Sequence, residues 1–189
     1  IHHRVKNNLQ IIDSLLMMSH LDQPDIELNF MSLSSSDLVR NIYARFESSM
    51  KEKNMTGELI LGDESTQLLG DEFLLNEVLR QVIDNAVRVS HDGGKIVLRT
   101  AVRQNFGIIE IVDNGFGMDD TTIAQIFDRF YRADEARATN SGGSGLGLSI
   151  SKKIMDLHNG RIEVESLRGK GSLFRLWVPL AGAEKTSKS

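Results

Sequence analysis

The chain has 189 residues, of which 40% are hydrophobic and 25% charged, and these values are ordinary for one globular domain with an appendage. Its formal net charge of −4 gives no reason to expect a nucleic-acid partner. It contains no cysteine, which excludes disulfides, thiol catalysis and cysteine-based zinc sites. No apolar run approaches the roughly 20 residues that a membrane helix needs.

The first part of the chain predicts two helices joined by an extended link. Residues 2–21 carry apolar residues at helical spacing, and Pro24 stops the run. Residues 26–33 alternate with a period near two, which indicates a strand or an extended linker. The run Ser-Ser-Ser-Asp at 34–37 offers N-cap side chains for a second amphipathic helix, which we expect to reach about residue 53.

The rest of the chain alternates short strand patterns with helical ones. We expect strands over 57–63 and 65–71, a helix over 73–90, a hairpin turning at Gln104-Asn105, a helix over 146–158 and a last hairpin turning at 168–171. Because short turns join most strands, the order predicts an α+β fold. The expected form is a two-layer sandwich with a mixed, mostly antiparallel sheet and helices on one face.

A glycine-rich loop at 142–147, Gly-Gly-Ser-Gly-Leu-Gly, runs directly into the predicted helix over 146–158. Glycines let the backbone take positive φ and approach a ligand closely, and successive N–H groups can surround an anion. The N-terminus of the following helix points at the same place. The loop therefore favours a phosphate site, with a merely flexible loop as the alternative. It lacks the Lys-Ser/Thr ending of a Walker loop.

Two further segments carry polar residues in apolar surroundings. Asp113 follows a predicted strand beside Gly115 and Gly117, where its carboxylate could accept a hydrogen bond from a flat ligand such as adenine. An ordinary Asp-Asn-Gly turn is the alternative. Asn85 interrupts an apolar helix, so its amide is either a structural hydrogen-bonding group or an oxygen ligand for Mg²⁺. Arg88, about one turn further on, could reach a phosphate.

Together, the order and spacing of these segments resemble the catalytic domain of sensor histidine kinases, within the ATPase superfamily shared with Hsp90, MutL and type II topoisomerases. The resemblance covers roughly residues 34–180. It rests on an N box (EVLRQVIDNAVRVS, 77–90), a G1 box (DNGFGM, 113–118), an F box (FDRFYRAD, 127–134), a G2 box (GGSGLGLSI, 142–150) and a terminal strand (GSLFRLWVP, 171–179). The F box is typical of the kinases and not of Hsp90 or MutL. The resemblance implies a Bergerat-type ATP-binding fold.

The resemblance also implies roles for individual residues. Asn85 would bind Mg²⁺, Asp113 would hold the adenine amine, and Glu77 would polarise the attacking histidine. Further nucleotide contacts would come from Arg88, Gly115, Gly117, Phe127, Phe130, Gly143, Gly145, Leu146, Gly147 and Ser172. Residues 128–142 would form a lid over ATP. The two phenylalanines would anchor that lid, and ordinary core packing is the alternative for them.

A few residues depart from the family pattern or carry no assigned role. Gln81 stands where many members have another asparagine, which we expect to alter the Mg²⁺ shell only in detail. Val89 replaces a common tyrosine, which removes a ring from the nucleotide site. The histidines His20, His91 and His158 show no metal-ligand spacing and are expected at the surface or as helix caps.

The N-terminal segment resembles two parts of a histidine kinase at once. Residues 1–16, IHHRVKNNLQIIDSLL, resemble the H box of one subclass, in which His3 would be the phosphoacceptor, so this match overlaps the next one. Residues 9–22 are similar to the end of the second dimerisation helix, which normally follows the H box by a whole hairpin. Either the true H box lies upstream and His3 is a solvated helix residue, or the chain joins two pieces with a deletion.

We therefore expect a partial dimerisation helix and linker over 1–33, an ATP-binding catalytic domain over 34–181 and a disordered tail over 182–189. The expected activity moves the γ-phosphate of Mg·ATP to a histidine and then to an aspartate of a response regulator. The expected partners are ATP, a response-regulator receiver domain and a second copy joined through the dimerisation helices. Because the chain starts at Ile1, we expect a fragment from the cytoplasmic side of a parent that an upstream segment could anchor in a membrane.

Two rival functions remain open. One is an ATPase machine of the Hsp90 or MutL type, in which ATP drives dimer closure, and the F box argues against it. The other is a nucleotide-sensing module that binds ATP without transferring phosphate. Detection of phosphohistidine would separate this module from a kinase.

Overall fold

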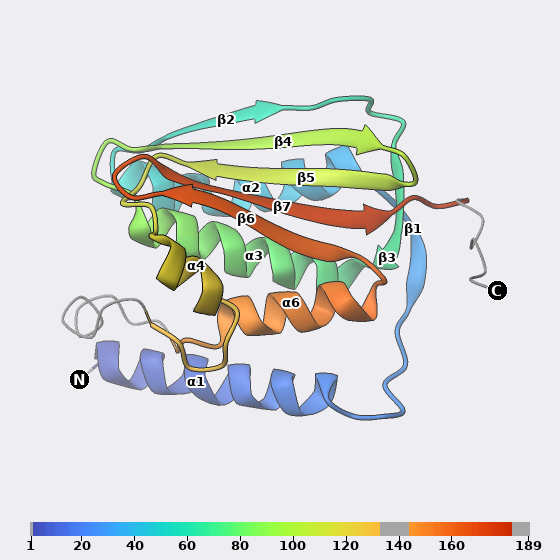
Figure 1. The fold of residues 1–189 in the computed structure, drawn as a ribbon, viewed down its shortest axis with the longest axis horizontal. Helices are drawn as coiled ribbons and strands as arrows, with labels where there is room; N and C mark the ends of the chain where they lie inside the picture. The colour runs from blue at the N-terminus through green and yellow to red at the C-terminus, as the bar shows by residue number, and fades with distance from the viewer. Residues whose placement is uncertain (1, 133–143, 183–189) are drawn as a thin grey trace.

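The computed structural model describes residues 2–132 and 144–182, and a five-stranded sheet forms its centre (Figure 1). The elements are α1 (His2–Leu21), β1 (Phe30–Ser34), α2 (Ser35–Glu52), β2 (Thr56–Ile60), β3 (Gln67–Asp71), α3 (Glu72–Val89), β4 (Lys95–Arg103), β5 (Phe106–Asp113), α4 (Asp120–Gln125), α6 (Gly147–Leu157), β6 (Arg161–Leu167) and β7 (Gly171–Pro179). The predicted α+β class is confirmed. The short helix α4 was not predicted from the sequence.

The main sheet is mixed, with its strands in the order β2-β4-β5-β7-β6. The three pairs β4–β5, β5–β7 and β6–β7 are antiparallel, whereas β2 runs parallel to β4. β1 and β3 form a separate antiparallel ribbon, so the extended link over 26–33 contributes a true strand. The sheet is therefore mostly antiparallel, as predicted.

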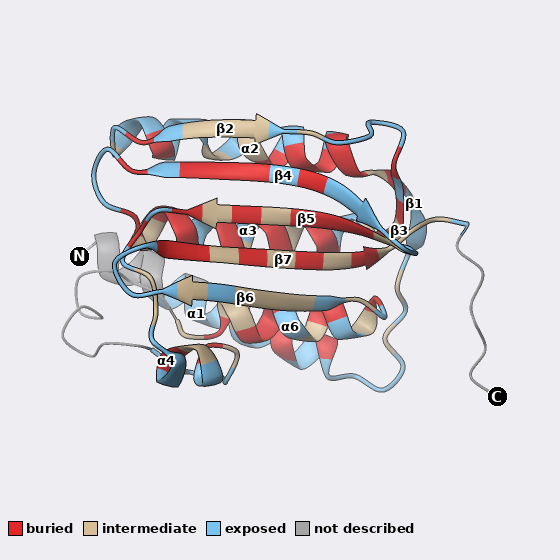
Figure 2. Ribbon diagram, turned by 45° about the horizontal axis from the view of Figure 1, so that its top comes forward, coloured by how far each residue is buried: buried red, intermediate tan, exposed pale blue. Residues whose placement is uncertain are grey.

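Helices α2, α3 and α6 cover one face of the sheet, and α1 packs beyond α6 (Figure 1). Figure 2 shows buried residues running along α3 and the central strands. Apolar residues at helical spacing give α3 its buried face: Leu74, Leu75, Val78, Leu79, Val82, Ile83, Ala86 and Val87. This face fixes α3 against the sheet and so positions the polar residues near its C-terminal end.

Capping residues explain where the covering helices begin and end. The Ser34 hydroxyl accepts a hydrogen bond from the Asp37 N–H at 3.1 Å, and Asp71 Oδ1 accepts one from the Leu74 N–H at 3.1 Å. His158 is the C-cap residue of α6, as expected for a cap, but it is only 1% exposed. Its Nε2 accepts a hydrogen bond from the Asp71 N–H at 3.0 Å, which ties the end of α6 to the start of α3.

Several expectations fall on residues that the structure does not describe. These are most of the lid, with Gly143, and the tail from residue 183. His3 lies in α1, but its side chain is outside the described part as well. The expected boundary between residues 33 and 34 stays a prediction.

Candidate nucleotide-binding site

Asp113 is a buried carboxylate at the end of β5. It is 3% exposed, and its Oδ1 accepts a hydrogen bond from the Gly115 N–H at 2.8 Å. Burial raises the pKa of Asp113, while the hydrogen bond from Gly115 and the polar groups of the cross-strand neighbour Ser172 act in the opposite direction. Within the described residues, Oδ2 has no hydrogen-bond partner. A buried acceptor without a partner is costly, so this atom is suited to a ligand that donates a hydrogen bond.

The loop after Asp113 lies between the end of α3 and the turn that joins β6 to β7. The Phe116 N–H donates to the Val89 carbonyl oxygen at 3.3 Å, and a Cβ on Gly115 would come within 2.6 Å of that same oxygen. Gly117 has φ +62°, and a Cβ there would overlap the Leu167 carbonyl oxygen. Both glycines are therefore required by the close approach of the backbone.

Asn85 and Arg88 contact each other on the half-buried face of α3. The Arg88 Nη2 donates to Asn85 Oδ1 at 2.6 Å. Burial lowers the pKa of Arg88, and the nearby Asp84 opposes that shift. The Arg88 Nε is buried and has no partner among the described residues. A desolvated guanidinium with an unused donor is suited to an anion, such as a phosphate.

The described part of the glycine-rich loop leads into α6 with its amides available. Gly145 has φ +71°, and its carbonyl oxygen accepts a hydrogen bond from the Phe130 N–H at 2.9 Å. Leu146 is buried, at 1% exposure, and is the N-cap residue of α6. Among the described residues, no side chain at this N-cap position forms a capping hydrogen bond with the helix. The first amides of α6 therefore offer donors and a positive dipole end to an anion.

Close packing brings the start of α6 onto α3. A Cβ on Gly147 would overlap Oε1 of Gln81, so a side chain there would have to displace the Gln81 amide. Gln81 in turn donates from Nε2 to Glu77 Oε1 at 2.7 Å. The helix α3 thus contacts both the loop after Asp113, through Val89, and the glycine-rich loop, through Gln81.

The two phenylalanines of the F box differ in their surroundings. Phe127 is half-buried and packs against the hydrophobic core, which is the ordinary packing role considered for it in the sequence. Phe130 is 62% exposed and has φ +65°, so core packing is wrong for this side chain. Its backbone, rather than its ring, contacts the glycine-rich loop through the hydrogen bond to Gly145.

Glu77, the candidate polarising group, is engaged by its neighbours on α3. Its carboxylate accepts from Arg80 at 2.6 Å and 2.8 Å in addition to the bond from Gln81. It lies eight positions before Asn85, which corresponds to about 12 Å along a helix. The structure therefore groups Asp113, Arg88 and the glycine-rich loop around the C-terminal half of α3, and it leaves Glu77 toward the middle of that helix.

Two residues with a place in this arrangement were missed by the sequence analysis. Lys53 Nζ donates to the Val87 carbonyl oxygen at 2.8 Å, which supports the last turn of α3 next to Arg88. Gly171 has φ +98°, and a Cβ there would overlap the Asp113 carbonyl oxygen. Its place in a Gly-Lys-Gly turn just before Ser172 is a signal that could have indicated it. No sequence signal indicated Lys53.

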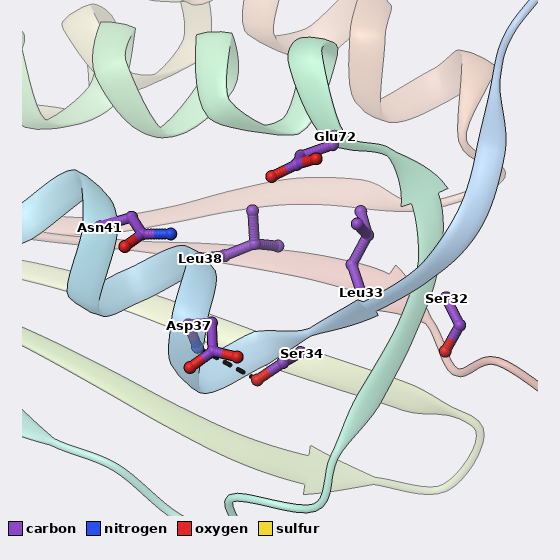
Figure 3. A pocket seen from close by; sticks show the side chains of 7 residues that line it. All are labelled: Ser32, Leu33, Ser34, Asp37, Leu38, Asn41 and Glu72. Atoms are coloured by element: carbon purple, nitrogen blue, oxygen red, sulfur yellow. Dashed lines mark hydrogen bonds between the residues drawn. The ribbon is translucent and has the colours of Figure 1, made fainter.

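A separate hollow of about 290 Å³ lies at the N-terminus of α2 (Figure 3). Figure 3 shows Asp37 beside Ser34, to which it is hydrogen-bonded, with Asn41 and Glu72 at other sides of the hollow. None of its seven lining residues is basic, which does not suit a phosphate. Glu72 begins α3, whereas Arg88 is near the other end of that helix, so this hollow is distinct from the candidate site.

The described residues contain no group of three or more His, Cys, Asp or Glu side chains that could hold a metal ion. Among the described helices, none is both long and apolar enough to cross a membrane.

Comparison with protein families identifies the two parts of the chain. A family model described as "Histidine kinase-, DNA gyrase B-, and HSP90-like ATPase" matches residues 70–182, which include Asn85, Asp113 and the glycine-rich loop. A model described as "Histidine kinase" matches residues 1–56, which include the segment that resembles an H box.

Curated relatives are sensor kinases that are longer than this chain. The sensor histidine kinase WalK of Bacillus subtilis (strain 168) is 31% identical over 173 residues, which are 90% of this chain and 28% of WalK. The sensor protein kinase WalK of Staphylococcus aureus is also 31% identical, over 90% of this chain and 41% of that protein. The chain therefore spans well under half of the length of these relatives.

Solved structures share the fold at low sequence identity. The catalytic domain of histidine kinase ThkA has a TM-score of 0.71 at 24% identity and covers 80% of this chain and 95% of that one. Full-length ShkA in complex with AMPPNP has a TM-score of 0.84 at 23% identity, over 95% of this chain and 37% of that one. The first of the two family models matches residues 70–182, which are more than half of the chain. This chain therefore belongs to the histidine kinase-, DNA gyrase B- and HSP90-like ATPase family.

Proposed function

We propose that this chain is the ATP-binding catalytic part of a sensor histidine kinase, which transfers the γ-phosphate of ATP to a histidine and then to an aspartate of a response regulator. The observation that carries the proposal is the buried Asp113, whose Oδ2 has no partner among the described residues. The loop after it contacts α3 at Val89, next to Arg88 with its unused donor, and the uncapped start of α6 contacts the same helix at Gln81. The curated relatives are themselves named sensor kinases.

In this proposal each side chain has a binding task. Asp113 Oδ2 accepts a hydrogen bond from the exocyclic amine of adenine, because Oδ1 already accepts one from the Gly115 N–H. The first amides of α6, next to Gly145, surround the phosphates. Arg88 turns its guanidinium from Asn85 to a phosphate oxygen. Holding the γ-phosphate in line with a histidine supplies most of the catalysis, since little covalent chemistry falls to the protein.

Asn85 is the candidate ligand for Mg²⁺. Its Oδ1 is an oxygen of the kind that Mg²⁺ prefers, and it now accepts a hydrogen bond from Arg88. The residues fit the ion if Arg88 moves to the phosphates, which leaves that oxygen free to bind the metal. When bound, Mg²⁺ would neutralise charge on the phosphates, and they and water would complete its coordination.

The partners of the reaction are part of the same proposal. His3 on α1 is the candidate phosphoacceptor, and a histidine upstream of this chain is the alternative. A structural neighbour with a TM-score of 0.77 is ThkA in complex with the response regulator protein TrrA, which supports a receiver domain as the second acceptor. We further propose that the parent protein works as a dimer and presents this domain on the cytoplasmic side.

One observation favours a second candidate function, a nucleotide-sensing module without transfer. Glu77 would have to polarise the attacking histidine, but its carboxylate is held by Arg80 on both oxygens. If that pairing persists with ATP bound, the chain would bind nucleotide without a group that activates the acceptor.

Labelled Mg·ATP tests both candidates at once. Asp113→Asn should abolish acid-labile, base-stable protein phosphate and should weaken ATP binding about 10-fold or more, because a charge-assisted hydrogen bond contributes about 1.5–3 kcal/mol. The control Asp37→Asn changes an exposed aspartate of the distant hollow and should leave both signals intact. Loss of label in His3→Gln would identify the acceptor.

The possible results separate the candidates. Labelled phosphohistidine supports the kinase and removes the sensing module. ATP binding that depends on Asp113, without any label even when a histidine-bearing helix bundle is added, supports the sensing module. Absence of ATP binding by the unmodified chain would sink both.

A further inference from the structure

Asp22 joins the end of α1 to two other segments of the protein. It directly follows Leu21, the last residue of the helix. Its Oδ2 pairs with Arg129 Nη2 at 2.9 Å and its Oδ1 with Lys153 Nζ at 3.3 Å. Arg129 belongs to the F box and Lys153 to α6, so one carboxylate links α1, the F box and α6.

This carboxylate lies at the C-terminus of a helix, and its two cationic partners offset the unfavourable charge there. The C-terminus of a helix carries a partial negative charge, so an acidic residue there is unfavourable without a partner. The pairing with Arg129, followed by that with Lys153, lowers the pKa of Asp22. All three side chains are 36–54% exposed, so each pair alone is weak and is screened by salt.

Apolar packing places α1 so that these pairs can form. Met18 and Leu21 are 5% and 1% exposed and belong to the hydrophobic core, next to α6. Figure 1 shows α1 running along α6 on the side away from the sheet. Among the described side chains of α1, the buried ones therefore lie at its C-terminal end, which Asp22 directly follows.

The contact continues from Asp22 to the glycine-rich loop. Arg129 is followed by Phe130, whose N–H donates to the Gly145 carbonyl oxygen at 2.9 Å. The two backbones are so close that a Cβ on Gly145 would come within 2.8 Å of the Phe130 carbonyl carbon. Phe130 also holds a left-handed conformation, at φ +65°, which its surroundings must stabilise.

We infer that Asp22 is a positioning residue that couples the docking of α1 to nucleotide binding at Gly145 and the start of α6. When α1 is docked, Asp22 fixes Arg129 and thereby the backbone of Phe130 against Gly145, so that the loop is preorganised for phosphates. Coupling between two sites is reciprocal, so bound nucleotide also favours the docked helix. The nucleotide half of this inference rests on the proposed function, whereas the docking half does not.

The test measures the affinity for AMPPNP by calorimetry in Asp22→Asn, in Arg129→Gln and in the double variant. Each single change should weaken binding about 5-fold, the lower end of typical coupling. The double variant should bind no more weakly than Asp22→Asn, because that single change already removes the contact with Arg129. Asp22→Glu keeps the carboxylate and should recover most of the affinity. Raising the salt concentration should reduce the difference between the unmodified chain and Asp22→Asn.

A matched control is available in the ion pair Arg40–Glu64, which is similarly exposed and lies away from α1. Glu64→Gln should leave the affinity for AMPPNP unchanged. Amide hydrogen exchange over residues 11–21 should rise in Asp22→Asn, should fall when AMPPNP is added to the unmodified chain, and should not respond in Glu64→Gln.

Two results would overturn the coupling while the proposed function stands. One is unchanged or tighter binding by Asp22→Asn in a chain that binds AMPPNP normally, and the other is additive losses in the double variant. If the unmodified chain binds no nucleotide, the proposed function fails together with the coupling. The exchange of residues 11–21 in Asp22→Asn then still decides whether the carboxylate holds α1 in place.

Discussion

At the scale of single residues, Asp113 should behave as a ligand-binding group and not as a stabilising one. Burial raises the folded-state pKa of Asp113 above the ordinary 3.8. The stability that the neutral carboxyl group provides is therefore present below pH 3.8 and is lost as the pH rises through the folded-state pKa. At pH 7 the fold therefore bears the cost of a buried charge. In Asp113→Asn the amide oxygen would keep the bond from Gly115 and place an NH₂ group where the adenine amine must donate.

This variant should therefore unfold at the same temperature as the unmodified chain or higher at pH 7, while it loses ATP affinity. Thermal unfolding without nucleotide, together with an ATP titration, checks both expectations. A marked loss of stability would instead make Asp113 a structural residue of the β5–β7 pair.

His158 should make the fold sensitive to mild acid. Its Nδ1 faces the Ile154 carbonyl oxygen at 2.8 Å and its Nε2 accepts from the Asp71 N–H, so the neutral ring fits this site. Burial lowers the pKa of His158 below its ordinary 6.5. The stability that the neutral ring provides is therefore present above pH 6.5 and is lost as the pH falls below that value.

The free energy of unfolding should drop between pH 7.5 and pH 5.5. His158→Gln should lower the free energy of unfolding by about 1–3 kcal/mol at pH 7.5, because buried groups lose their hydrogen-bond partners. It should also reduce the change in that free energy between the two pH values. Urea unfolding at the two pH values measures this. The variant His91→Gln changes an exposed histidine and should leave the pH dependence of the free energy of unfolding unchanged. If both variants reduce that pH dependence equally, His158 is not the group that titrates.

The sequence predicted single residues well where backbone geometry demands one residue type. Gly117 and Gly145 were chosen from motifs, and both take positive φ in places where a side chain would collide. It did not predict the partners of long charged side chains, such as Asp22 with Arg129, which are 107 positions apart. Such pairs depend on how helices pack, and a local pattern holds no information about that packing.

At the scale of elements, the N-cap of α3 should matter more than that of α2. Asp71 accepts from the Leu74 N–H through Oδ1 and from the Asn29 N–H through Oδ2, so it also fixes the chain before β1. Ser34, the cap of α2, accepts a single bond from the Asp37 N–H. Asp71→Ala should cost about 2 kcal/mol or more, and Ser34→Ala about 1 kcal/mol.

Urea unfolding at pH 7.5 compares the two caps directly. Equal losses would mean that the bond from Asn29 contributes nothing beyond the helix cap.

Helix and hairpin positions were predictable because their signals are local. Ser34 and Asp71 precede apolar periodic runs, and Asn159, with φ +52°, ends α6 where Asn159-Gly160 predicted a stop. The parallel pairing of β2 with β4 had no such signal, since α3 and β3 separate them in the chain. The short α4 has only six residues and too few positions for a helical period to show.

At the scale of the whole molecule, the two-layer class followed from the order of elements, whereas the sheet order did not. The hairpins β4–β5 and β6–β7 follow from short turns, but placing β7 beside β5 depends on contacts between distant segments. The candidate site depends on that placement, because it sets Ser172 opposite Asp113. Motif resemblance supplied the site residues, and the pairing of β5 with β7 explains why two of them meet.

The uncovered face of α1 leads to a prediction about assembly. Leu9, Ile12 and Leu16 recur at helical spacing and are 54%, 51% and 64% exposed, whereas Met18 and Leu21 are buried against the domain. Leu16 lies seven positions after Leu9, which corresponds to about 10 Å along a helix, so these side chains form a short apolar stripe. Exposed apolar stripes of this kind mark surfaces that associate, and we expect two copies of the chain to pair through them.

Ile12→Glu should place a charge in the middle of that stripe and convert the expected dimer to a monomer at micromolar concentrations, since a buried unpaired charge is costly. Sedimentation velocity across a concentration series measures this. Phe73→Glu is the matched control, because Phe73 is 69% exposed but stands alone at the start of α3, and it should leave the mass unchanged. ATP binding should survive in both variants, because neither side chain belongs to the candidate site. A chain that is monomeric without any substitution would show that this stripe alone does not hold two copies together.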